Sequence, residues 1–177
     1  MIPAGTYTIE REHSELGFQV RHAGIAKVRG KFTDYDGTIV VADDVAQSSA
    51  EVTMQTASVF TGSEARDNHL RSADFFDAEA NPTITFRSTE VRLDGGEDLA
   101  LAGDLTINGV TRPVELEVEY NGAATDPFGN QRIGFEAKTR VNRKDFGLTW
   151  NAALETGGVL VSDQVTILLD VSAVKQA

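Results

Sequence analysis

Hydrophobic and polar residues alternate along most of this chain, in short runs that are typical of half-buried β-strands. The clearest run spans residues 114–120, where four apolar residues are separated by three glutamates. Similar runs occupy residues 16–20, 99–107, 133–141 and 165–171. Successive side chains of a strand point to opposite faces, so each run has one apolar face and one polar face. The pattern predicts antiparallel strands that pack on one side and meet water on the other.

Turn signals separate these runs. Asn108-Gly109 lies between two of them and predicts a tight hairpin, because both residues tolerate positive φ. Further turns are expected at residues 95–96, 127–130 and 157–158, and Pro82 and Pro113 are expected at strand starts. The spacing predicts an all-β fold of about eight to ten strands, a sandwich or a barrel, in one domain that spans residues 1–177.

One segment departs from the alternation. Between residues 63 and 72, Ser63 is a candidate helix N-cap, and Asp67 and Arg71 are four residues apart. This pattern predicts a short helix inserted between strands.

Composition and charge narrow the possible partners. The chain has no cysteine, which excludes disulfides, thiolate catalysis and thiolate metal sites. Its 27 acidic and 16 basic residues give a net charge of −11, which argues against tight binding of nucleic acid or an anionic membrane surface. No apolar run is long enough to span a bilayer, and the start of the chain has no signal-peptide pattern, so a cytoplasmic location is expected.

Candidate catalytic and metal-binding residues are few. His22 shares the parity of the apolar residues 16, 18 and 20 and is expected to point inward, whereas His13 is expected in a turn and His69 on the short helix. No two histidines have the spacing that places both on one metal. There is no nucleophile motif and no phosphate-binding loop. We therefore expect no catalytic residue, no cofactor and no metal.

Six segments carry distinctive motifs. They are residues 12–22 (EHSELGFQVRH), 27–32 (KVRGKF), 61–77 with its RDxHLxSxDFF pattern, 82–89, 103–114 and 143–148 (RKDFGL). Together these segments resemble the YceI-like family. The resemblance covers nearly the whole chain in order. Glu10 or Glu12 stands where the family often has an aspartate, and Lys144 replaces a common serine.

The resemblance implies a lipocalin-like antiparallel barrel, often dimeric, whose pore holds a polyisoprenoid or another long-chain lipid without catalysing a reaction. Periodicity alone identifies the large aromatic residues as core, and the resemblance places them around the ligand. The ligand-binding candidates are Phe18, Val20, His22, Phe32, Phe60, Phe75, Phe76, Phe86, Phe135, Phe146 and Trp150.

A polar head group would need partners at the pore mouth, for which Arg66, Asp67 and His69 on the short helix are the candidates. The alternative is that Asp67 pairs with Arg71 and the motif only fixes the helix to the barrel. Many relatives are exported to the periplasm, and this chain lacks their leader.

Two other functions stay open at this point. The barrel could belong to an enzyme that uses His22 or His69 as acid–base on an isoprenoid substrate. It could also belong to a stress-related protein that binds a partner through its outer face.

Overall fold

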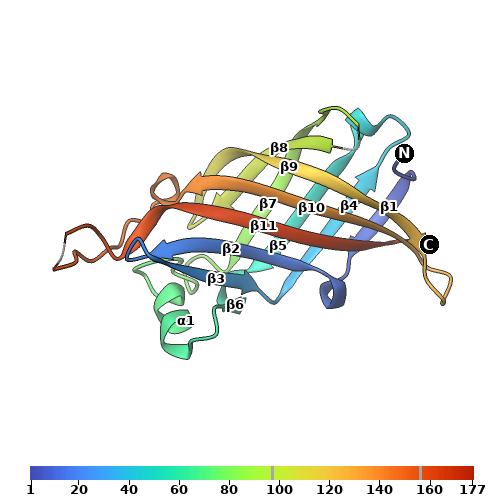
Figure 1. Ribbon diagram of the computed structural model, residues 1–177. Helices are drawn as coiled ribbons and strands as arrows, with labels where there is room; N and C mark the ends of the chain where they lie inside the picture. The colour runs from blue at the N-terminus through green and yellow to red at the C-terminus, as the bar shows by residue number, and fades with distance from the viewer. Residues whose placement is uncertain (97, 156) are drawn as a thin grey trace.

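The computed structural model describes residues 1–96, 98–155 and 157–177, and its strands form one antiparallel barrel (Figure 1). The strands are β1 (Gly5–Ile9), β2 (Glu15–His22), β3 (Ala26–Phe32), β4 (Tyr35–Val41), β5 (Ser49–Gln55), β6 (Val59–Phe60), β7 (Thr83–Leu93), β8 (Asp98–Ile107), β9 (Val110–Thr125), β10 (Gln131–Asn142) and β11 (Val161–Lys175). Within the described residues, the helical elements are α1 (Glu64–Arg71) and the 3-10 segments η1 (Arg11–His13), η2 (Val45–Gln47), η3 (Thr56–Ser58) and η4 (Arg143–Phe146).

The eleven strands make a closed ring of eight, because three of the ring's members are bent. One edge of β11 pairs with β1 through residues 173–175 and with β2 through residues 161–170, so β1 and β2 follow one another along the same edge. In the same way β3 continues into β4, and β5 continues through η3 into β6. The β1–β11 pairing closes the ring, so the strands of the described residues have no long free edge. The predicted antiparallel, lipocalin-like barrel of about eight strands is confirmed.

Other sequence predictions can be compared with the elements directly. The helix predicted near residues 63–72 is α1, and its Ser63 side chain accepts a hydrogen bond from the Arg66 amide, as an N-cap does. Asn108 (φ 54°) and Gly109 (φ 72°) form the predicted hairpin turn. Pro113 is an exception, because it lies inside β9 and not at its start. No helix among the described residues is long and apolar enough to cross a membrane.

A bulge keeps one long strand apolar towards the interior. The pairing of β7 with β8 shifts register between Ser88 and Glu90. Ile84 and Phe86 therefore face inward before the bulge, and Val91 does so after it, although its position has the opposite parity. A strict two-residue period would have turned this part of β7 outward.

Two strand glycines make room for aromatic rings inside the barrel. A Cβ atom placed on Gly30 would lie 2.3 Å from Cζ of Phe18, and one on Gly103 would lie 2.4 Å from Cζ of Phe86. Any side chain at either position would displace the ring beside it. Phe18 and Phe86 thus lie flat against the inner wall, where they leave the centre of the barrel open.

A cluster of charged residues lies outside the barrel, where the β9–β10 turn meets η1. Arg132 bonds to Glu10, and its Nε donates to Asp126 Oδ2 at 2.9 Å. Partial burial acts to raise the pKa of Asp126, but hydrogen bonds from Asn130, Arg132 and Phe128 outweigh it and lower that pKa to about 2. The hydrogen bond from Arg132 likewise lowers the pKa of Glu10.

This depressed pKa predicts a pH-dependent contribution to stability. An unfolded aspartate titrates near pH 3.9, so the stabilisation by Asp126 is fully present above about pH 4 and is lost as the pH falls towards about 2. Urea unfolding should show Asp126→Asn less stable than the wild type at pH 7, with the difference shrinking between pH 4 and pH 2. Asp43→Asn, at an exposed position with no hydrogen bond or ion pair to the described residues, should show no such trend. A constant difference for Asp126→Asn across that range would contradict the assignment.

Candidate ligand-binding cavity

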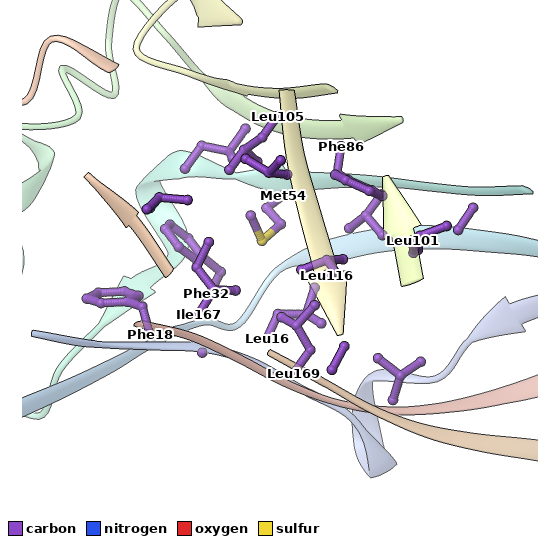
Figure 2. Close-up of a pocket in the computed structure, with 18 of the residues that line it drawn as sticks. Leu16, Phe18, Phe32, Met54, Phe86, Leu101, Leu105, Leu116, Ile167 and Leu169 are labelled. Atoms are coloured by element: carbon purple, nitrogen blue, oxygen red, sulfur yellow. The ribbon is translucent and has the colours of Figure 1, made fainter. Parts of the chain in front are cut away.

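A cavity of about 280 Å³ lies inside the barrel, and side chains from all eight ring members line it. Figure 2 labels ten of these residues, among them Leu16, Leu116 and Ile167, which converge on a shared space from the surrounding strands. Seven of the ten come from the apolar faces of the alternating runs, and the other three are Phe32, Met54 and Phe86. The cavity is therefore where the apolar faces predicted from the sequence meet.

The cavity wall is almost entirely hydrocarbon. Ser48, Ser49 and Arg143 are the polar side chains among the described lining residues. Along β11 the lining runs from Val161 to Val171, and the regularly paired part from Val165 to Val171 alone spans about 20 Å at roughly 3.3 Å per residue. The cavity is thus elongated along the strands and offers hardly any hydrogen-bonding groups to a bound molecule.

Both ends of the cavity are covered. At one end, Leu70 of α1, Phe75 and Phe76 after it, and Phe146 of η4 close the wall. At the other end the cover comes from Ile2 near the N-terminus and from residues 45–49 around η2. An elongated molecule inside would be surrounded by the barrel wall and partly covered at both ends, as in a lipocalin-like barrel that holds a small ligand.

The structure places eight of the eleven predicted ligand-binding residues on the cavity wall. They are Phe18, Val20, Phe32, Phe75, Phe76, Phe86, Phe135 and Phe146. Their contact with a ligand stays a prediction.

The other three lie off the wall. His22 has the inward parity of β2, but it stands at the exposed end of the strand, beyond the cavity. In β6 the buried Val59 faces inward, so its neighbour Phe60 points outward and is 51% exposed. Trp150 packs against His69, with ring centroids 4.6 Å apart, and against Phe75 at 5.3 Å. Trp150 therefore packs against the residues that cover one end of the cavity, on the side away from the cavity.

Two of the three predicted head-group residues, Arg66 and Asp67, are bonded to the loop that precedes α1. Asp67 is buried and accepts a hydrogen bond of 2.8 Å from the Thr61 amide. Arg66 donates to the Thr61 carbonyl, also at 2.8 Å. Asp67 makes no ion pair with Arg71, whose guanidinium instead donates to backbone carbonyls of residues 57 and 59. These hydrogen bonds fix α1 to the barrel, as the alternative interpretation of the sequence expected. They do so without the Asp67–Arg71 pair on which that interpretation relied.

The histidines lie on three separate elements. His69 Nε2 is 2.9 Å from Asp74 Oδ2, beside the end cover. His13 Nδ1 is 3.1 Å from Glu10 Oε2 and has Glu12 beside it, in a small surface group outside the cavity. Neither these two nor His22 line the cavity. An acid–base role for His22 or His69 on a molecule inside the barrel therefore has no support from their positions.

Arg143 is the functional candidate that the sequence interpretation missed. It is 4% exposed and lines the cavity, and its Nη1 donates to the carbonyls of Leu148 (2.7 Å) and Trp150 (2.8 Å). Its Nε donates to Ser162 O at 2.9 Å, and its Nη2 lies 3.4 Å from Val161 O. Burial lowers the pKa of Arg143. The sequence did contain a signal for Arg143. It lies two residues after Val141 and so continues the alternation of positions 133, 135, 137 and 141, which face inward.

Comparison with known proteins places this geometry in context. The model of the YceI-like domain family matches residues 7–173. Protein YceI from a strain of Escherichia coli is 40% identical over 176 residues, which cover 98% of this chain and 88% of that protein. Among solved structures, Burkholderia cenocepacia BcnA superposes with a TM-score of 0.82 at 22% identity, over 93% of this chain and 98% of that one. A polyisoprenoid binding domain from Saccharophagus degradans, implicated in plant cell wall breakdown, superposes with a TM-score of 0.73 at 16% identity, over 98% and 100% of the two chains.

Proposed function

Because this chain belongs to the YceI-like domain family, we propose that its barrel binds a long-chain apolar lipid, of the polyisoprenoid or isoprenoid quinone type, for storage, transport or sensing. The observation that carries the proposal is the elongated cavity, whose wall is hydrocarbon apart from three polar side chains. The description of the Saccharophagus degradans domain as polyisoprenoid-binding supports the choice of lipid class.

The energetics favour a chain-like hydrocarbon over a polar ligand. Each buried CH₂ group contributes about 0.8 kcal/mol, so a five-carbon isoprene unit contributes roughly 3 to 4 kcal/mol before the cost of association. Three or four buried units would exceed the roughly 8 kcal/mol of a micromolar complex. A polar ligand would lose its hydrogen bonds to water and find few replacements on this wall.

We infer a carrier and not an enzyme, since no described histidine lines the cavity. An acid–base residue must come within hydrogen-bond reach of the atom that it protonates, or act through one water. Lipid turnover in cell extracts that falls when His22 or His69 is replaced by glutamine would favour the enzyme instead. A homodimer, which the family resemblance implies, stays a prediction that light scattering can check.

Mass spectrometry of an organic extract from natively purified protein tests the proposal. We expect a long-chain lipid in roughly stoichiometric amount that is absent from an unrelated acidic protein treated in the same way. Lipid-free protein should also take up an added polyisoprenoid alcohol. Failure of both the extract and the uptake would overturn the proposal.

A further inference from the structure

The distribution of charge on the barrel is uneven. Residues 16–33 contain none of the chain's 27 acidic residues but include Arg21, Lys27, Arg29 and Lys31. All four have the outward parity of β2 and β3, and we name them the basic stripe. In the register of this hairpin Arg21 lies directly opposite Lys27, and Lys31 follows two positions beyond Arg29. The stripe therefore runs along the outer face of one hairpin of a strongly acidic protein.

Most of the basic stripe is unpaired. Lys31 is 3.6 Å from Glu15, whereas Arg21, Lys27 and Arg29 are exposed and make no ion pair with any described residue. Like charges directly opposite one another on a sheet are destabilising. A partner of negative charge on this face would remove that repulsion.

Exposed apolar side chains lie at the end of the same hairpin. Ile25, in the β2–β3 turn, is 85% exposed, and Val159, in the neighbouring segment 157–160, is 50% exposed. The two segments are joined by a 2.7 Å hydrogen bond from the Ala23 amide to the Leu160 carbonyl. In Figure 1 both project from one end of the barrel, opposite the 126–130 turn. Val20 and Val161, just inside this end, line the cavity.

From this combination we propose that the barrel docks on an anionic lipid bilayer through the β2–β3 hairpin. Ile25 and Val159 enter the head-group region, and Arg21 and Lys27, at the turn end of the basic stripe, face the anionic lipids. Each cation near such a surface is worth about fivefold in binding. The rest of the protein is acidic: Asp98, Glu119, Glu136 and Asp170 lie directly opposite one another across β8 to β11. Charges farther than about 8 Å from the bilayer are screened at physiological salt, so the net charge of −11 does not prevent a local contact.

A bilayer fits these observations better than nucleic acid, because projecting Ile25 and Val159 would have no role on a phosphate backbone. The proposal goes beyond lipid binding in the cavity and does not require that the cavity be filled. It identifies the end of the barrel that faces the membrane.

Co-sedimentation with vesicles tests the docking. The wild type should sediment with phosphatidylcholine vesicles that contain phosphatidylglycerol, but not with pure phosphatidylcholine, and the binding should weaken as salt is added. Ile25→Asp should reduce binding at least about tenfold. Phe128→Asp, which changes an 89% exposed residue in the opposite turn, should leave it unchanged.

A second pair of variants distinguishes the effect of charge within the basic stripe from the effect of the net charge of the protein. Lys27→Glu should reduce vesicle binding about 25-fold, since it removes one attractive charge and adds one repulsive charge. Lys138→Glu changes the net charge by the same amount on the acidic wall and should have little effect. The proposal is overturned if these two variants weaken binding equally, if the wild type fails to bind at low salt, or if DNA competes with the vesicles while Ile25→Asp behaves as the wild type. A variant that loses lipid from the cavity but still binds vesicles would contradict the proposed cavity function and not the docking.

Discussion

Replacing Arg143 by methionine is expected to lower the free energy of unfolding by about 3 to 5 kcal/mol, because three largely buried carbonyl groups lose a charged hydrogen-bond donor. Methionine keeps the apolar stem of the side chain but leaves the carbonyls of Leu148, Trp150 and Ser162 without their donor. Each buried carbonyl that loses its hydrogen bond costs about 1 to 3 kcal/mol. Urea unfolding followed by Trp150 fluorescence measures the loss.

The neighbouring residue supplies the control. Lys144→Met removes a cation that is 51% exposed and should change stability by less than about 1 kcal/mol. Arg143→Lys should lie between the two, because an ammonium group has fewer donors and lacks the planar fork of the guanidinium. If Arg143→Met were as stable as Lys144→Met, the bonds from Arg143 to Leu148, Trp150 and Ser162 would not be what anchors these residues.

Ala137→Phe should weaken lipid binding while making the lipid-free protein more stable. Ala137 lines the cavity on β10, so a ring there would occupy space that the proposed ligand uses. Excluding two or three carbons of a bound chain costs roughly 2 kcal/mol, or about thirtyfold in affinity. Filling an empty apolar cavity commonly adds 0.5 to 2 kcal/mol to the free energy of unfolding. Lipid per protein in organic extracts and the urea midpoint of delipidated protein measure the two effects.

An outward-facing position provides the matched control for this substitution. Leu168 lies on β11 opposite Lys138, with 42% of its surface exposed. Leu168→Phe adds a ring outside the barrel and should leave lipid retention unchanged. Lipid retained by Ala137→Phe at the wild-type amount would place the ligand somewhere other than this cavity.

Strands could be predicted from the sequence wherever the alternation of apolar and polar residues continues over several residues. The run at residues 114–120 predicted β9, and Ser63 predicted the start of α1, because alternation and capping are local properties. The bends were not predictable in this way. At η1 and η3 the chain leaves the extended conformation for three residues each, so the phase of the following strand is lost. Phe60 was placed on the wrong face for this reason, since β6 has two residues and no period of its own.

The sequence analysis predicted an apolar barrel interior and many of its lining residues, but not the shape of the cavity. The family resemblance placed eight residues around the ligand that do line the cavity, but alternation could not show that the barrel is hollow, because the same pattern describes a filled core. The space depends on particular neighbours, such as Gly103, which leaves room for the ring of Phe86 against the wall. Trp150 lies in an irregular segment, where no period assigns a direction. Arg143 was missed because a charged residue at an inward position is uncommon unless the backbone around it supplies partners.

The β1–β11 pairing also has a kinetic consequence. Tyr7 lies opposite Lys175, so the barrel closes through contacts between the most distant parts of the chain. The neighbouring hairpins can form early, because their strands are adjacent in sequence, whereas this closure must first overcome the entropy of a loop that contains the whole barrel. Until β11 pairs with β1 and β2, the unpaired backbone groups of these strands can form hydrogen bonds with other chains. The time before closure is therefore when this protein is most exposed to aggregation, and it is also when the interior is most accessible to a lipid.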